Sequence, residues 1–104
     1  MVNINEKYVE NYIRSLFPSH EGILKELEAY ALENHIPIIE REVAQLLKVL
    51  LKMYKPRKIL EVGTAIGYSA IVMASSTEDN CNITTIERRE DMVHIARKNI
   101  KATA

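Results

Sequence analysis

Two carboxylates and two glycines are spaced so that together they could hold a nucleoside-containing ligand. Glu61 lies inside a short apolar run, and Gly63 follows it by two residues. Gly67 comes four residues later, and Glu87 lies 24 residues after Gly63. A strand that ends in a glycine turn and continues as a helix leaves backbone N–H groups and a helix N-terminus facing a ligand. The spacing therefore predicts a ligand-binding turn rather than an ordinary connection.

The glycine spacing and the carboxylate positions also restrict the kind of ligand. Gly63 and Gly67 do not form the Gly-x-Gly-x-x-Gly pattern of dinucleotide sites, so a cofactor without a pyrophosphate fits better. Glu87, at the end of a predicted strand, can accept hydrogen bonds from both hydroxyls of a ribose. Glu61 can face a cation such as an ammonium group, because a carboxylate inside an apolar strand costs free energy without a partner.

Apolar residues recur at helical spacing in three segments before the turn. The first helix is predicted to be capped by Asn3 or Asn5. The second is predicted over about residues 19–34, with Ser19 as its N-cap. The third is predicted over about residues 39–54, with five apolar side chains facing inward: Val43, Leu46, Leu47, Leu50 and Leu51.

After these helices the sequence predicts strand, helix, strand and helix, over about residues 58–62, 68–76, 82–87 and 89–101. This order implies an α/β fold in which two parallel strands are joined by a right-handed crossover. The near-continuous apolar character of the first strand is typical of a strand with neighbours on both sides. We therefore expect either the front part of a larger doubly wound domain or a sheet completed by self-association at its open edge.

Composition excludes several classes of protein. Fourteen basic and fourteen acidic side chains among 104 residues cancel, so the chain lacks the overall positive field typical of proteins that bind nucleic acid by charge alone. Cys81 is the only cysteine and no charged-then-apolar leader opens the sequence, which favours a reducing cytoplasm. No apolar stretch approaches the roughly 18 to 20 residues of a membrane span, and no membrane partner is expected. Three histidines lack metal-ligand spacing and are expected at the surface or as caps: His20, His35 and His94.

Three stretches resemble the front half of the bacterial S-adenosylmethionine-dependent O-methyltransferases. They are residues 36–40 (IPIIE), 59–70 (ILEVGTAIGYSA) and 85–87 (TIE), and the likeness extends over essentially the whole chain. The wider family includes the catechol and caffeoyl-CoA enzymes, and the nearest likeness is to the enzymes that methylate 5-hydroxyuridine in transfer RNA. The resemblance implies the N-terminal half of a Rossmann-like class I methyltransferase fold, with a helical segment in residues 1–55 and the first part of the cofactor-binding domain in residues 56–104.

The resemblance also implies roles for individual residues toward S-adenosylmethionine. Glu61 is implied to orient the amino end of the cofactor, Ser69 to hydrogen-bond its carboxylate, and Glu87 to bind its ribose. Tyr68 is expected to be a packing residue. Five further positions complete the implied cofactor site: Ile39, Gly63, Thr64, Ala65 and Gly67.

The catalytic lysine and metal-binding carboxylates of this family lie downstream of the stretch that the chain covers. The resemblance therefore implies no catalytic and no metal-binding residue here, Mg²⁺ only in a full-length enzyme, and no turnover by the isolated chain. The implied acceptor is 5-hydroxyuridine in tRNA or a small catechol-like molecule. Five basic residues form either a solvated face or a surface that attracts tRNA: Lys48, Lys52, Lys55, Arg57 and Lys58.

A second interpretation comes from a different functional class. In it the chain is a non-catalytic binding module with a vestigial cofactor site. Two copies would associate through the open edge of the first strand.

Overall fold

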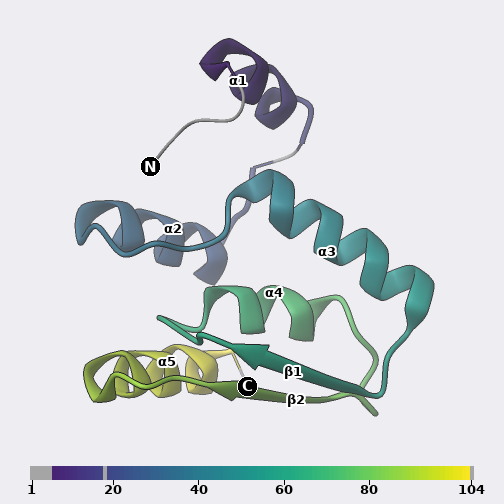
Figure 1. The fold of residues 1–104 in the computed structure, drawn as a ribbon, viewed down its shortest axis with the longest axis vertical. Helices are drawn as coiled ribbons and strands as arrows, with labels where there is room; N and C mark the ends of the chain where they lie inside the picture. Colours follow the sequence, from purple (N-terminus) through teal and green to yellow (C-terminus); the bar gives the residue numbers. More distant parts are fainter. Residues whose placement is uncertain (1–5, 18, 104) are drawn as a thin grey trace.

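Three helices precede a strand–helix–strand–helix unit in the computed structural model, which describes residues 6–17 and 19–103 (Figure 1). The elements follow in the order α1 (Lys7–Ser15), α2 (Ile23–Glu33), α3 (Arg41–Tyr54), β1 (Lys58–Val62), α4 (Tyr68–Ser75), β2 (Asn82–Ile86) and α5 (Glu90–Ala102). The predicted order of elements and the α/β class are confirmed. None of the described helices is long and apolar enough to cross a membrane.

Strands β1 and β2 pair in parallel over five residues each, ending with Val62 opposite Ile86. The chain leaves both strands at the same end of the sheet, which brings Gly63 and Glu87 close together. In the described part of the chain the sheet has two strands, so β1 keeps one unpaired edge.

The two faces of this sheet have different surroundings. Side chains alternate between the faces of a strand, and Glu61 points to the face that Ser69 of α4 contacts. On the opposite face, Leu60 and Val62 are 66% and 81% exposed. The sheet is therefore covered on one face and exposes apolar side chains on the other.

Helix α4 is the most buried of the described helices. Five of its eight residues are buried, as expected for a helix that is apolar on all sides. It packs against α2 and α3 on one side and against β2 on the other, and Figure 1 shows it between them. The buried core around it consists of Leu27, Ala31, Ala44, Ile66, Tyr68, Ile71, Val72 and Met92.

The predicted N-caps are not the observed ones. Helix α2 begins after Gly22, whose φ of 63° is left-handed, so the prediction of Ser19 as its N-cap is wrong. The chain makes a sharp left-handed turn there, which glycine adopts without steric cost and serine does not. Glu6 is the N-cap of α1. Asn3 and Asn5, predicted for that role, lie outside the described residues.

Helix α3 begins at Arg41, two residues later than predicted, because residues 36–40 are extended and their isoleucines pack on the core. The buried contact of α3 is Ala44, and the small alanine side chain allows α3 to lie close to α4. Leu47 and Leu51 are half-buried. The other three apolar side chains that were predicted to face inward are exposed, so that prediction is wrong for them: Val43, Leu46 and Leu50.

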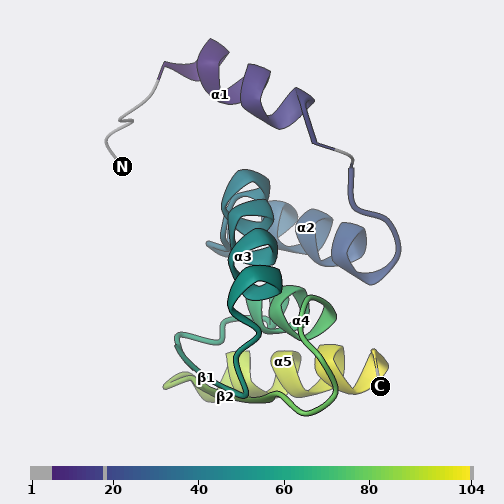
Figure 2. The same cartoon turned by 90° about the vertical axis from the view of Figure 1, so that its right-hand side faces the viewer.

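Helix α1 lies apart from the core (Figure 2). Charged side chains join it to α3 and to the residue before α3. Nε of Arg14 donates to both carboxylate oxygens of Glu42 at 3.1 Å, and its Nη2 lies 3.2 Å from Glu40. Nη2 of Arg41 donates to the carbonyl oxygen of Arg14 at 3.1 Å. The hydrogen bond to Glu42 raises the pKa of Arg14. No residue of α1 is buried.

Candidate functional site

The turn after β1 is a left-handed connection tied to the end of β2. Gly63, Ala65 and Gly67 have φ angles of 98°, 48° and 90°. The backbone N–H groups of Gly63 and Thr64 donate to the carbonyl oxygen of Ile86 at 2.7 and 3.2 Å. Glycine adopts positive φ without the steric cost that other residues carry. The two glycines therefore allow the chain to follow this path beside β2.

The two glycines have different surroundings. A Cβ atom placed on Gly63 would meet no atom within 4 Å, so this position borders open space. A Cβ atom on Gly67 would lie 3.4 Å from Cγ1 of Ile100 and 3.6 Å from Ala96. Gly67 thus lets the turn pack against α5, and Gly63 keeps the backbone open on the side from which a ligand would approach.

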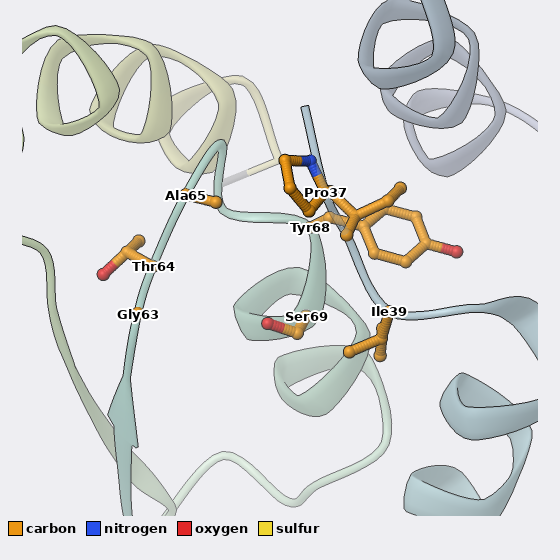
Figure 3. Close-up of a pocket in the computed structure, with 8 residues that line it drawn as sticks. Pro37, Ile39, Gly63, Thr64, Ala65, Tyr68 and Ser69 are labelled. Carbon is orange, nitrogen blue, oxygen red and sulfur yellow. The ribbon is translucent and has the colours of Figure 1, made fainter. Parts of the chain in front are cut away.

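A hollow of about 240 Å³ lies between this turn and the extended segment before α3 (Figure 3). Its lining consists of Pro37, Ile38, Ile39, Gly63, Thr64, Ala65, Tyr68 and Ser69. Complete small-molecule pockets usually measure about 300–1,000 Å³, so this hollow can hold part of a cofactor-sized ligand. Five of the predicted site residues line it: Ile39, Gly63, Thr64, Ala65 and Ser69.

A chain of polar side chains runs beneath the turn. Oε1 of Glu61 accepts a hydrogen bond from Oγ1 of Thr85 at 2.7 Å, and Oε2 accepts one from the Ser69 hydroxyl. The Oγ1 atoms of Thr64 and Thr85 lie 2.6 Å apart. The carboxylate of Glu61 therefore has the partners that a carboxylate within a strand requires.

Thr85 is a member of this polar chain that the sequence analysis missed. It lies directly opposite Glu61 in the parallel register. Alternation along the two predicted strands could have placed both side chains on one face. Asn99 was missed as well, and its Nδ2 donates to the carbonyl oxygen of Ile66 at 2.8 Å, which ties α5 to the turn.

The start of α4 presents backbone donors to the hollow. Helix α4 begins at Tyr68 after Gly67, and no side chain caps its first turn. The first N–H groups of a helix have no partner within the helix and carry partial positive charge. The Ser69 hydroxyl already donates to Glu61, so its oxygen is available as an acceptor. The backbone N–H groups are therefore the donors that this end of the site offers to an anion.

Glu87 fixes the turn to the end of β2. Its Oε2 accepts a hydrogen bond from the N–H of Arg89 at 3.0 Å, and its Oε1 accepts one from the N–H of Ala65 at 2.8 Å. These two backbone bonds, that of Arg89 first, lower the pKa of Glu87 below its ordinary value. A carboxylate has about four lone-pair positions, so Glu87 keeps capacity for a further donor. It lines a neighbouring hollow of about 360 Å³, which shares Thr64 with the first.

The histidines differ from one another in their surroundings. Nδ1 of His20 lies 2.6 Å from Oε2 of Glu28, and the His20 side chain is only 14% exposed. Its expected place at the surface is therefore wrong, because helices α2, α3 and α4 meet around it. His35 and His94 are exposed. Among residues 6–17 and 19–103, no three His, Cys, Asp or Glu side chains gather as metal ligands.

Sequence comparison identifies the family. The sequence pattern of the O-methyltransferase family matches residues 15–104. The chain belongs to the O-methyltransferase family. A caffeoyl-CoA O-methyltransferase from Stellaria longipes is 35% identical to this O-methyltransferase chain over 91 residues, which cover 84% of the chain and 37% of that relative. The narrower likeness to the tRNA 5-hydroxyuridine enzymes stays a prediction.

Two solved structures share the fold of this O-methyltransferase chain. A proposed caffeoyl-CoA O-methyltransferase from Staphylococcus aureus is 36% identical in sequence and superimposes with a TM-score of 0.75. The match covers 97% of this chain and 46% of the Staphylococcus aureus chain. An O-methyltransferase from Bacillus cereus, in complex with S-adenosylhomocysteine, is 27% identical in sequence and has a TM-score of 0.78. The match covers 90% of this chain and 44% of the Bacillus cereus chain. The chain spans less than half the length of these relatives and has the fold of the N-terminal part of a Rossmann-like methyltransferase.

All eight predicted site residues lie around one end of the sheet. Five line the first hollow. Glu61 lies beneath the turn, Gly67 ends it, and Glu87 anchors it. What each of them does toward a ligand remains a prediction.

Proposed function

We propose that this O-methyltransferase chain binds S-adenosylmethionine at the turn after β1. The observation that carries the proposal is the placement of Glu61 and Glu87 near the ends of adjacent parallel strands, on either side of the turn that Gly63 opens. Membership of the family supports it. The Bacillus cereus relative, whose structure contains S-adenosylhomocysteine, supports it further.

The first hollow fits the amino-acid end of the cofactor rather than the whole molecule. The N–H groups at the start of α4 would hold the carboxylate, while Glu61 and the oxygen of Ser69 would accept hydrogen bonds from the ammonium group. The role implied for Ser69 changes accordingly, because its hydroxyl hydrogen is already donated to Glu61. Ile39 would contribute its backbone from the opposite wall.

Glu87 would hold the ribose of the cofactor. Because hydrogen bonds from backbone N–H groups lower its pKa, its carboxylate is ionised at neutral pH and can accept ribose hydroxyls. The same negative charge would repel a 2′-phosphate. Glu87 therefore selects for an unphosphorylated ribose.

The chain contributes binding and orientation rather than the complete reaction. Bound S-adenosylmethionine supplies an electrophilic methyl group on a sulfonium. The side chains that line the first hollow include no base, since burial and the bond to Glu28 raise the pKa of Tyr68. Among the described residues no three His, Cys, Asp or Glu side chains gather as metal ligands, and we derive no step through a metal. We expect no methyl transfer to a catechol by the purified chain with added Mg²⁺, and turnover in that assay would contradict this.

A calorimetric titration with S-adenosylhomocysteine tests the binding proposal. We expect Gly63→Ala to weaken binding at least about tenfold, because the new methyl group enters the open side of the turn and strains a φ of 98°. Gly22→Ala is the matched control, since Gly22 also has positive φ and open space around it but lies at the start of α2. Its affinity should stay within about twofold of wild type. No binding by the wild type, or equal affinity in both variants, contradicts the proposal.

We propose tRNA as the acceptor in preference to a small catechol-like molecule. Lys52 and Lys55 line a hollow of about 320 Å³ beside the last turn of α3. Lys58 belongs to the same basic run and opens β1, so its backbone lies roughly 16 Å from Gly63 at the other end of the strand. An acceptor as large as folded RNA can reach both places, whereas a small molecule cannot.

Charge reversal tests this choice of acceptor. The double variant Lys52→Glu/Lys55→Glu should weaken tRNA binding and lower the slope of log affinity against log salt by about two, because each phosphate contact contributes about 0.9. The control is Lys98→Glu/Lys101→Glu, which reverses two exposed charges on α5. Unchanged affinity and slope in the first variant favour a small acceptor instead.

The alternative of a self-associating module rests on a separate observation. Within the described part of the chain, strand β1 has an unpaired edge, and Leu60 and Val62 are exposed on the uncovered face. We propose that a second copy pairs at this edge. Light scattering should then give the mass of a dimer for the wild type and of a monomer for Val62→Lys. A monomeric wild type contradicts the alternative.

We further propose how the chain is divided. Residues 1–55 would form the helical segment that supplies one wall of the site through residues 37–39, and residues 56–104 would supply the cofactor-binding portion. We propose a reducing cytoplasm as its location, in keeping with the free thiol of Cys81.

A further inference from the structure

Four polar side chains from separate segments meet behind the candidate cofactor site. Nδ1 of His20 lies 2.6 Å from Oε2 of Glu28 on α2, and the Tyr68 hydroxyl donates to the same oxygen at 2.5 Å. Nζ of Lys48 on α3 lies 2.9 Å from Nε2 of His20. Tyr68, the first residue of α4, is 1% exposed. The cluster therefore connects α2, α3 and α4 through the segment that precedes α2.

The donors and acceptors of this cluster determine the state of the His20 ring. The ammonium group of Lys48 can only donate, so Nε2 of His20 must be the acceptor. The ring proton is then on Nδ1 and is donated to Glu28. Tyr68 completes the cluster as a second donor to Glu28. Burial and this hydrogen bond raise the pKa of the Tyr68 hydroxyl, so it keeps the proton that it donates.

Tyr68 links the cluster to the candidate site. It lies between Gly67, which ends the turn, and Ser69, which bonds to Glu61. Tyr68 lines the first hollow and also another hollow of about 400 Å³, which Glu28 lines too. Figure 3 shows the hydroxyl of Tyr68 pointing away from the turn. The cluster therefore holds a residue that borders both hollows.

Resting on the proposed function, we infer that His20, Glu28 and Lys48 are positioning residues that hold Tyr68 and the first turn of α4 for cofactor binding. The juxtaposition that carries this is the contact of Lys48 with Nε2 of His20.

The contacts of His20 hold the start of α4 against two other helices. Glu28 faces the ring from α2, Lys48 from α3 and Tyr68 from α4. Removal of one of these side chains leaves a polar partner without its hydrogen bond and loosens the start of α4.

Calorimetric titration with S-adenosylhomocysteine tests the inference. Tyr68→Phe, which removes the donor to Glu28, should bind about two- to tenfold more weakly than the wild type. His20→Asn removes the contact with Lys48 and should weaken binding by a similar factor. His94→Asn, which removes an exposed histidine on α5, should keep the wild-type affinity.

A second measurement reads the cluster without any ligand. A long-range ¹H–¹⁵N spectrum shows which imidazole nitrogen carries the proton, and His20 should carry it on Nδ1 at pH 8. A proton on Nε2, or equal affinity in the wild type, His20→Asn and Tyr68→Phe, overturns the inference and leaves the proposed function intact. Absence of binding by the wild type overturns both.

Discussion

Helices α1 and α4 are joined to the rest of the molecule by different forces. Helix α4 buries five of its eight residues against two helices and the sheet, whereas α1 buries none and is attached by Arg14 to carboxylates of α3 and the residue before it. Burial of apolar side chains is worth several kcal/mol for a helix, and exposed ion pairs are worth about 0–1 kcal/mol each. The difference implies that the helix at the candidate site is firmly held and that α1 can detach without unfolding the core.

Matched isoleucine truncations should show the largest difference between the two helices. Ile71 on α4 is buried and Ile13 on α1 is half-buried. Ile71→Ala should lower the free energy of unfolding by about 2–5 kcal/mol, because it leaves a cavity in the core. Ile13→Ala should cost about 1 kcal/mol or less. Denaturant titration measures both, and equal losses would contradict the difference in attachment.

The contact of the turn with α5 should show the next largest effect. Gly67→Ala should lower the free energy of unfolding by about 1–3 kcal/mol, since it strains a φ of 90° and brings a methyl group to 3.4 Å from Ile100. Gly63→Ala strains a positive φ as well but brings the new methyl group near no other atom, so it should lower the free energy of unfolding less. The comparison of the two variants by thermal unfolding isolates the packing against α5. If Gly63→Ala proved less stable than Gly67→Ala, the predicted importance of the contact with α5 would be contradicted.

Removal of the ion pairs of α1 should have a small effect. Arg14 has a side chain that is 30% exposed and pairs with Glu42 and Glu40. Arg14→Ala should lower the free energy of unfolding by about 1 kcal/mol or less, and high salt should reduce the effect further. Hydrogen exchange of the α1 amides should speed up while that of α4 stays unchanged. A loss above about 2 kcal/mol would show that α1 belongs to the cooperative core.

The attachment of α1 should also depend on pH through Glu42. Burial is the largest influence on this carboxyl and raises its pKa, but hydrogen bonds from its own backbone N–H and from Arg14 together lower the pKa below the ordinary value. The folded pKa lies below the unfolded one, so Glu42 stabilises fully above about pH 4.3 and loses this contribution as the pH falls through the folded value. The protection factors of the α1 amides against hydrogen exchange should therefore fall below about pH 4. In Arg14→Ala this dependence on pH should shrink, and an unchanged dependence would implicate another carboxyl.

Most of the fold follows from local sequence patterns. The strands, the turn and α5 were predicted to within about a residue, because short β-forming runs and two glycines mark their limits. The start of α2 was not predicted correctly, since Gly22 with a positive φ is the N-cap and the expected Ser19 is not. The orientation of α3 could not be read from its apolar residues, because the small side chain of Ala44 decides which side approaches α4.

The candidate site was predictable where it depends on neighbours in sequence. Gly63 and Glu87 were located from their spacing along one strand–turn–helix unit and the strand after it, and Ser69 from the resemblance to the methyltransferase family. The cluster around His20 was not predictable, because its members come from segments up to 48 residues apart and meet only when α2, α3 and α4 pack. The bond between Ser69 and Glu61 likewise depends on side-chain directions that the spacing leaves open.

The most direct test of a cofactor site is an amide chemical-shift map of the chain titrated with S-adenosylhomocysteine. The shifts should concentrate in the turn from Gly63 to Ser69, in the segment around Ile39 and at Glu87, and α1 should remain unaffected. Gly63→Ala should abolish these shifts at the same ligand concentration. A spectrum that does not change, or shifts centred on α1 or on the exposed face at Leu60, would contradict the account.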